Sequence, residues 1–265
     1  MAVGQRGERL NMAKRKYLCV IQARMGSKRL PGKILLKVNH ITMLEYLIKR
    51  VRQSRKIDKI IIATSQDNSN DKVEKICKKV GVSCFRGSED DVLDRYYKCS
   101  LDNSQYEYII RLTADNPLID PTVIDEVITF SEKHPEYDYV SNNLVRTFPC
   151  GMDIEIIKRG VLAEVARKAK SASEREHVDE YILNNKKYKK GNVSSDYDWS
   201  GFRLTVDYKE DYEVIKFLIK NTKITDNYLT YVSLLTRQPH RFLNNAKYNF
   251  IKCVSYKIKQ TARHL

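Results

Sequence analysis

The sequence predicts an α/β fold, in which a mostly parallel sheet has helices on both faces. Apolar runs at residues 17–21, 59–63, 82–86 and 108–112 have the length of buried strands. Segments with apolar residues at helical spacing lie between these runs. Strands that alternate with helices favour parallel pairing and right-handed crossovers, which cover both faces of the sheet.

Length and composition are those of a soluble globular chain. The 265 residues allow one elaborated domain or two small ones, and a hydrophobic content of 42% is enough for a core. No apolar run approaches the length of a membrane span. The net charge of +15 would suit a nucleic-acid binder, but the lysines are scattered and no nucleic-acid motif is present. We therefore expect no specific nucleic-acid partner.

The N-terminus and the cysteines point to a cytoplasmic protein. Residues 1–16 are basic without a following apolar core, so they are not a signal peptide. We expect a disordered leader there, with Met12 as an alternative start. The six cysteines form no CxxC pair and no metal-ligand spacing. In a chain without an export signal they indicate reduced thiols.

Capping residues mark the helices between the first four strands. Thr42 and Glu45 form a capping box before an apolar stripe at helical spacing. Asn70 is a candidate cap for a helix that Gly81 ends. Apolar periodicity predicts two more helices, at residues 92–101 and after Asp120.

Beyond residue 140 the regular alternation of strands and helices fades. Residues 151–157 alternate polar and apolar side chains, as a half-buried strand does. A basic helix is predicted at 161–170, and a second capping box at 173–176 opens another. Residues 202–206 predict a strand that ends at Asp207, which is also a candidate N-cap for the next helix.

A basic loop follows the first predicted strand. Its sequence is Ala23-Arg24-Met25-Gly26-Ser27-Lys28-Arg29-Leu30-Pro31-Gly32-Lys33. Gly26 lets the backbone approach a ligand closely, and neighbouring N–H groups can point at phosphate oxygens. Arg24, Arg29 and Lys33 supply charge for an anion. The loop contains neither GxxxxGK[ST] nor GxGxxG, so on spacing alone a basic surface turn explains it equally well.

Three loops are expected to meet at one edge of the sheet. They follow predicted strands and begin at Arg24, Arg86 and Thr113. Ligands of parallel sheets bind beyond the carboxyl ends of the strands, where such loops lie. Asp115 in the third loop has a carboxylate suited to a hard cation that also touches phosphate oxygens. The alternative is that Asp115 only caps a turn.

Six motifs, in this order, resemble those of the CMP-sugar synthetases. They are RMGSKRLPGK (24–33), FRGSEDDVLDRYY (85–97), DNPLIDP (115–121), YVSNN (139–143), SEREHV (173–178) and RLTVD (203–207). The chain is most similar to the spore-coat polysaccharide cytidylyltransferase-like proteins, which are related to the acylneuraminate and Kdo cytidylyltransferases. The resemblance covers about residues 17–212. It implies a Rossmann-like sheet of the nucleotide-diphospho-sugar transferase type.

The resemblance also implies an activity and its residues. The chain would transfer CMP from CTP to a sugar or sugar-like acceptor, releasing pyrophosphate, in the synthesis of surface polysaccharide or glycoconjugate precursors. Asp115 and Asp207 would bind Mg²⁺ and act in catalysis with Arg24, Arg29 and Lys33. CTP would contact Ala23, Arg24, Gly26, Ser27, Arg29, Lys33, Arg86 and Ser88. The acceptor would contact Asn142, Asp153, Arg175 and His177.

Two of these acceptor residues also have a physical rationale. If a helix begins at Ser173, Arg175 and His177 lie near its positive end, which favours an acidic acceptor. The alternative is that His177 packs against Tyr181, four residues on. For Glu89 and Asp90, we favour the simpler interpretation of charges at a helix N-terminus.

The resemblance implies one catalytic domain at about residues 17–220. Within it, about residues 140–200 would serve acceptor binding and dimerisation, and the chain would form a homodimer. Apolar residues at helical spacing predict a C-terminal helical extension at residues 221–265. The extension carries no motif that assigns it a role.

Two other classes of protein remain as alternatives. A metal-dependent glycosyltransferase that uses a nucleotide sugar would need a DxD-type motif. The candidate, Asp196-Tyr197-Asp198, lies late in a lysine-rich region. A non-catalytic nucleic-acid-binding protein would explain the charge but not the ordered motifs.

Overall fold

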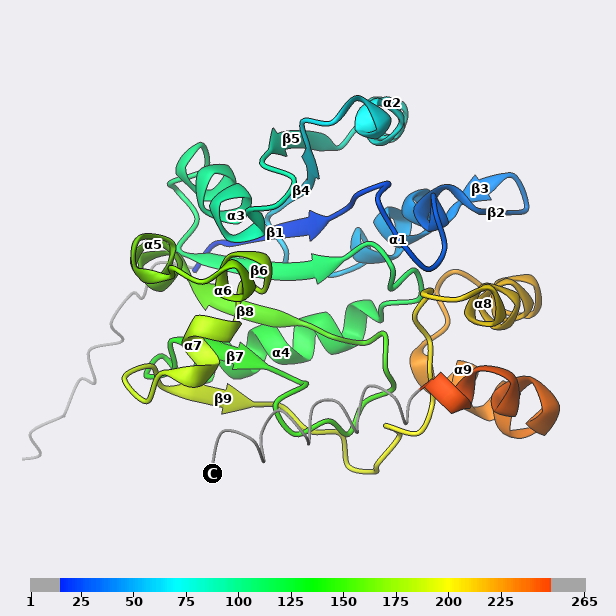
Figure 1. The fold of residues 1–265 in the computed structure, drawn as a ribbon. Helices are drawn as coiled ribbons and strands as arrows, with labels where there is room; N and C mark the ends of the chain where they lie inside the picture. The colour runs from blue at the N-terminus through cyan, green and yellow to red at the C-terminus, as the bar shows by residue number, and fades with distance from the viewer. Residues whose placement is uncertain (1–14, 249–265) are drawn as a thin grey trace, which may run out of the picture.

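The computed structural model describes residues 15–248 and shows a seven-stranded sheet with helices on both faces (Figure 1). The strand order is β5-β4-β1-β6-β8-β7-β9. The strands are β1 (Tyr17–Gln22), β4 (Lys59–Ser65), β5 (Ser83–Gly87), β6 (Tyr108–Thr113), β7 (Tyr139–Ser141), β8 (Glu155–Lys158) and β9 (Lys190–Asn192). Strands β5, β4, β1 and β6 are parallel, and β8 is antiparallel to its neighbours β6 and β7. The predicted Rossmann-like, mostly parallel sheet is confirmed.

Alternate residues of β1 face two different hydrophobic cores. Tyr17, Cys19 and Ile21 lie in the first core, and Leu18 and Val20 lie in the second. The helices of the first core are α1 (Met43–Val51), α2 (Asp71–Val80), α4 (Pro121–Lys133), α8 (Lys209–Asn221) and α9 (Tyr228–Thr236). Those of the second are α3 (Val92–Leu101), α5 (Arg159–Lys168) and α7 (Glu180–Asn184). Burial on both faces explains why the β1 segment is apolar at nearly every position.

Local signals determine several helix ends as predicted. The Thr42 hydroxyl accepts from the backbone N–H of Glu45, whose carboxylate accepts from the N–H of Thr42. Gly81 ends α2 with a φ of 65°, a conformation that favours glycine. Between β1 and α1 lie the 3₁₀ turn η1 (Lys33–Leu35) and a hairpin of β2 (Lys37–Val38) and β3 (Ile41–Thr42). The 3₁₀ turn η2 (Asn68–Asn70) connects β4 to α2.

Two predicted strands differ in the structure: residues 202–206 form no regular strand, and the strand predicted at 151–157 is shorter. Residues 202–206 are extended but pair only through one isolated bridge, between Cys150 and Arg203. After the bridge, the backbone N–H of Val206 donates to the backbone carbonyl oxygen of Asp115. This bond brings the segment close to the end of β6. In the 151–157 segment only the last residues belong to β8, because Gly151 has a φ of 106° in a turn.

The second capping box lies two residues earlier than predicted. The hydroxyl of Ser171 accepts from the backbone N–H of Glu174, and the Glu174 carboxylate accepts from the N–H of Ser171. This box begins the five-residue helix α6 (Ala172–Glu176), and His177 follows its last residue. The expectation that Arg175 and His177 lie near a helix N-terminus is therefore wrong.

The chain termini are partly tied to the domain. Arg15, within the predicted disordered leader, donates to the backbone of Ser131 and Glu132, so the leader's end is ordered. Residues 1–14 lie outside the described residues. At the other end α9 packs into the first core, and residues 239–248 are also helical. Residues 249–265 of the predicted extension, including Cys253, lie outside the description.

The described part of the chain gives two further structural facts. Its five cysteines are all free thiols, as predicted. Between residues 15 and 248, no helix has the length and apolar character needed to cross a membrane.

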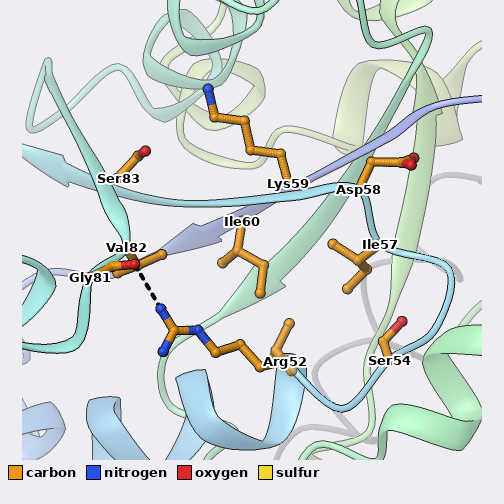
Figure 2. Close-up of a pocket in the computed structure, with 10 residues that line it drawn as sticks. Arg52, Ser54, Ile57, Asp58, Lys59, Ile60, Gly81, Val82 and Ser83 are labelled. Carbon is orange, nitrogen blue, oxygen red and sulfur yellow. Dashed lines mark hydrogen bonds between the residues drawn. The ribbon is translucent and has the colours of Figure 1, made fainter.

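A small hollow of about 290 Å³ lies where β4 begins (Figure 2). Arg52 crosses it and donates to the carbonyl oxygens of Val80 and Gly81 at 2.7 Å. Ile57, Ile60 and Val82 give it an apolar lining, and none of the predicted site residues contributes. It lies at the amino ends of the strands, opposite the edge where parallel sheets bind ligands.

Candidate functional site

A cleft of about 910 Å³ opens at the carboxyl ends of β1 and β6. The chain leaves β1 towards β4 and β5 on one side and returns to β6 on the other, so the strand order changes direction here. This is the position at which α/β sheets bind ligands. Residues of all three predicted loops line the cleft. The lining residues are Gln22, Arg24, Gly26, Ser27, Lys28, Arg29, Lys33, Ile34, Glu89, Asp90, Arg111, Thr113, Ala114, Asp115, Ala172, Glu176, His177 and Asp207.

The basic loop is held in shape by contacts outside it. The buried Asn70 accepts from the backbone N–H of Met25 and donates to the hydroxyl of Ser65. Asn70 stands at the N-terminus of α2 as predicted, but its side chain bonds the basic loop instead of capping the helix. Gly32 has a φ of 67° and precedes η1, which carries Lys33 to the cleft. Asn70 thus ties the loop to the end of β4.

Lys33 lies between the two predicted metal-site carboxylates. Its ammonium nitrogen is 3.0 Å from Asp115 Oδ2 and 2.9 Å from Asp207 Oδ1. Arg29 also contacts Asp207 Oδ1, at 2.9 Å, and the buried Arg203 contacts Asp207 Oδ2 at 2.9 Å. Two loops far apart in sequence thereby place carboxylates around one cationic position.

The protein environment keeps Asp115 ionised. Burial by itself would raise the pKa of its carboxyl. The ammonium of Lys33 and the hydroxyl of Thr113, 2.6 Å from Asp115 Oδ1, outweigh burial and lower that pKa below its usual value. The group therefore stays a carboxylate near neutral pH, the form that binds a cation.

The donor set of this position fits a hard divalent cation. Asp115 and Asp207 offer carboxylate oxygens, and their convergence on Lys33 shows that both can face one positive charge. No group of three or more histidine, cysteine or acidic side chains that could hold a metal ion gathers anywhere in residues 15–248, so this position offers two carboxylates. Mg²⁺ is commonly held by one or two carboxylates together with water and substrate phosphates.

Residues at the end of α6 and on β6 also line the cleft. His177 and Glu176 reach the cleft from the end of α6, and Glu176 lies 3.9 Å from Arg24. Arg111 on β6 also lines the cleft and pairs at 2.5 Å with the buried Glu155 of β8. The cleft is thus also lined by polar side chains that come from elements outside the basic loop.

Two of the predicted CTP contacts from the second loop do not reach the cleft. The Arg86 guanidinium pairs with Asp71 and Glu74 of α2 and also donates to three backbone carbonyls. All its donors are directed at protein groups. The Ser88 hydroxyl accepts from the backbone N–H of Asp91. Glu89 and Asp90, interpreted above as helix-terminal charges, line the cleft instead.

Ala23 and three of the predicted acceptor residues also have structural partners away from the lining. Ala23 is buried, and its N–H donates to Ala63. The buried Asn142 side chain donates to the carbonyl of Met152 and accepts from the N–H of Ile154. Asp153 pairs with Arg146, and Arg175 pairs with Asp91 of the α3 N-terminus. Of the four predicted acceptor residues, the structure brings His177 to the cleft.

Sequence reasoning missed Gln22, Lys28 and Arg111 as cleft residues. Gln22 and Arg111 interrupt apolar strand segments close to their carboxyl ends, where a buried polar group needs a reason. That interruption was a usable signal. Lys28 has no comparable signal, because it is one of several cations in a basic loop.

The fold and the cleft define an α/β protein with a basic loop and two carboxylates at the carboxyl edge of its sheet. A family model described as cytidylyltransferase matches residues 18–250. The chain therefore belongs to the cytidylyltransferase family, and it is a CTP-dependent nucleotidyltransferase.

Known relatives agree with this assignment. The spore coat polysaccharide biosynthesis protein SpsF of Bacillus subtilis is 39% identical over 210 residues, which cover 76% of this chain and 85% of SpsF. The 8-amino-3,8-dideoxy-manno-octulosonate cytidylyltransferase of Shewanella frigidimarina is 33% identical over 122 residues, 45% of this chain and 49% of that protein. A solved cytidylyltransferase from Leptospira borgpetersenii superposes with a TM-score of 0.82 at 35% identity, covering 86% of this chain and 97% of that one.

Proposed function

We propose that the protein transfers CMP from CTP to a sugar or sugar-like acceptor and releases pyrophosphate, with the residues of this cleft in the roles given below. The observation that supports these roles is that the basic loop, Asp115 and Asp207 converge on one cleft at the carboxyl edge of the sheet. The names of the relatives support an acceptor related to octulosonate sugars or to spore-coat polysaccharide precursors.

The basic loop would bind the triphosphate. Four basic side chains of the loop line the cleft: Arg24, Lys28, Arg29 and Lys33. Gly26 has no side chain, and a Cβ atom at this position would lie only 3.3 Å from Glu89 Oε1. Charges fixed in place before the reaction stabilise the negative charge that develops on the departing pyrophosphate. The loop would thus serve both binding and catalysis.

Asp115 and Asp207 would hold a divalent metal ion, which we expect to be Mg²⁺. When bound, such an ion supplies Lewis-acid polarisation of a phosphate oxygen. Lys33 pairs with both carboxylates, and Arg29 and Arg203 also pair with Asp207. The Lys33 ammonium would also bind phosphate oxygens of the triphosphate, because it lines the same cleft.

The acceptor would bind against His177, Arg111 and Gln22. An acceptor oxygen attacks the α-phosphorus, the bond between that phosphorus and the bridging oxygen breaks, and pyrophosphate leaves with the electron pair. His177 is placed to take the proton of an attacking hydroxyl. We further propose a homodimer acting in the cytoplasm, where CTP is available; sedimentation velocity tests the dimer.

Pyrophosphate release tests the activity directly. The protein is incubated with CTP, Mg²⁺ and a panel of sugar-acid acceptors, and pyrophosphate is detected. CTP should be used far better than UTP, because the exocyclic amine of cytosine donates where uracil accepts, and buried groups would be left unpaired. Asp207→Asn should abolish turnover, whereas Asp153→Asn, away from the cleft, should retain it. Equal use of UTP, or full activity of Asp207→Asn, would contradict the proposal.

The glycosyltransferase alternative has no support from the cleft. Asp196 and Asp198 are both exposed and do not line it. The same assay with a nucleotide sugar in place of CTP separates the two classes.

A further inference from the structure

Asp211 is a buried acceptor that organises the turn at Asp207. Its carboxylate accepts from the backbone N–H groups of Asp207 and Tyr208, at 2.9 and 3.0 Å. It also accepts from Arg203, whose Nε and Nη2 lie 2.8 and 3.0 Å from its two oxygens. The same Nη2 contacts Asp207 Oδ2. The Asp207 backbone and side chain are therefore both fixed through one buried ion pair.

The C-terminal segment, residues 239–248, completes this arrangement from behind. Asn245 is 1% exposed. Its Nδ2 donates to the carbonyl oxygen of Arg203 at 3.0 Å and to Asp211 Oδ1 at 3.1 Å. A buried amide that satisfies two groups of the network restricts both the Arg203 backbone and the Asp211 carboxylate.

The same segment supports Arg29 by a separate route. The Tyr248 ring stacks on the Tyr208 ring, with centroids 3.8 Å apart and planes 8° apart. Tyr208 in turn lies under the Arg29 guanidinium, 5.1 Å from ring centroid to Cζ. The Tyr248 hydroxyl donates to Glu210 at the start of α8. Tyr208 is thus held between the segment and the phosphate loop.

We propose that Asn245 and Tyr248 are positioning residues of the nucleotidyl-transfer site, Asn245 for Asp207 and Tyr248 for Arg29. This inference rests on the proposed roles of Asp207 and Arg29. Neither residue lines the cleft. They act through Asp211, Arg203 and Tyr208. Residues 239–248 then have a function in this chain, which is to fix one side of the active site.

Groups that orient a metal ligand without touching the metal affect both metal affinity and rate. Loss of such an outer contact typically costs about 10- to 100-fold. Asn245 contacts Arg203 and Asp211, which in turn hold Asp207, so we expect the lower end of this range, about 10-fold. Removing the Tyr248 ring, which stacks on Tyr208, would loosen the partly exposed cation–π contact between Tyr208 and Arg29. A contact of this kind corresponds to roughly 2- to 5-fold in the affinity for CTP.

The first test compares Asn245→Ala with Asn244→Ala, an exposed neighbour of the same type. Mg²⁺ binding is measured by calorimetry with a non-hydrolysable CTP analogue present, and the Mg²⁺ dependence of pyrophosphate release is measured in parallel. Asn245→Ala should raise the dissociation constant and the activation constant for Mg²⁺ about 10-fold. Asn244→Ala should leave both unchanged. If Asn245→Ala does not fold, Asn245→Ser is used in its place.

The second test compares Tyr248→Ala with Tyr248→Phe. Tyr248→Ala should raise the KM for CTP roughly 2- to 5-fold with little change in the KM for the acceptor. Tyr248→Phe keeps the stacked ring and should restore the KM of the unmodified protein. A rescue by phenylalanine separates ring stacking from the hydrogen bond to Glu210.

Two results would overturn the inference. The first is that both alanine variants fold and keep the Mg²⁺ and CTP constants of the unmodified protein. The second is that they lose thermal stability and kcat together while these constants stay the same, which indicates a purely structural role. If the unmodified protein binds neither Mg²⁺ nor the CTP analogue, the proposed function itself fails and the inference fails with it.

Discussion

Lys33 contacts both carboxylates of the proposed centre, and its loss should be the most damaging change in the basic loop. Lys33→Ala removes a preorganised charge next to the developing pyrophosphate and should lower kcat about 10²- to 10³-fold. Lys37→Ala, at an exposed position outside the cleft lining, is the matched control and should leave kcat nearly unchanged. Steady-state kinetics with circular dichroism checks both. Near-normal kcat in Lys33→Ala would remove this residue from the mechanism.

His177 and Arg175 should have different roles, although they are two residues apart. His177 lines the cleft, so His177→Ala should raise the KM for the acceptor and lower kcat, with little effect on the KM for CTP. Arg175 holds α6 to Asp91 and to the carbonyl of Ala166, so Arg175→Ala should lower the melting temperature and leave acceptor KM nearly unchanged. Kinetics in which each substrate is varied separately decides this. The opposite pattern would place the acceptor at Arg175.

At the scale of elements, the α1 capping box should make stability depend on acid. Burial would raise the pKa of Glu45, but bonds from Lys79 and from the backbone and hydroxyl of Thr42 lower it to about 2. The unfolded chain has the ordinary pKa, near 4.5. The stabilisation is therefore complete above that value and is lost as the pH falls towards 2.

The Glu45→Gln variant measures this contribution. It should lower the free energy of unfolding at about pH 7 and have a distinctly smaller effect at about pH 3, where the carboxylate of the unmodified protein has lost part of its advantage. Urea titrations of both proteins at the two pH values give the comparison. An equal difference at both values would mean that the Glu45 charge does not stabilise α1.

At the scale of the whole molecule, ligand and metal should stabilise the fold together. Under the proposed function CTP and Mg²⁺ would bind the folded state together, so they should raise the melting temperature in a concentration-dependent way. EDTA should remove most of this increase and abolish turnover, because the triphosphate alone leaves both carboxylates facing like charge. Differential scanning fluorimetry of the unmodified protein and of Asp207→Asn tests this. An increase that survives EDTA would contradict the metal assignment.

Some features were determined by the sequence alone, because their causes are local. The buried strands follow from apolar runs of strand length, and the α1 start from two residues three apart that satisfy each other's backbone. The convergence of the three loops follows from the rule that parallel strands end at one edge. These inferences placed the basic loop, Asp115 and the cleft correctly in the fold, and the family followed from motifs in order.

Tertiary structure decided which charged side chains reach the cleft. Arg86 and Arg111 both lie on strands next to site loops, but Arg86 has carboxylates of α2 within reach, and Arg111 faces the cleft beside Glu155. Asn245 meets Asp211 and Arg203 across 34 and 42 residues of sequence. No local pattern encodes such contacts, because the partner of a buried polar group is fixed by the packing of distant elements, and burial without that partner would be unfavourable.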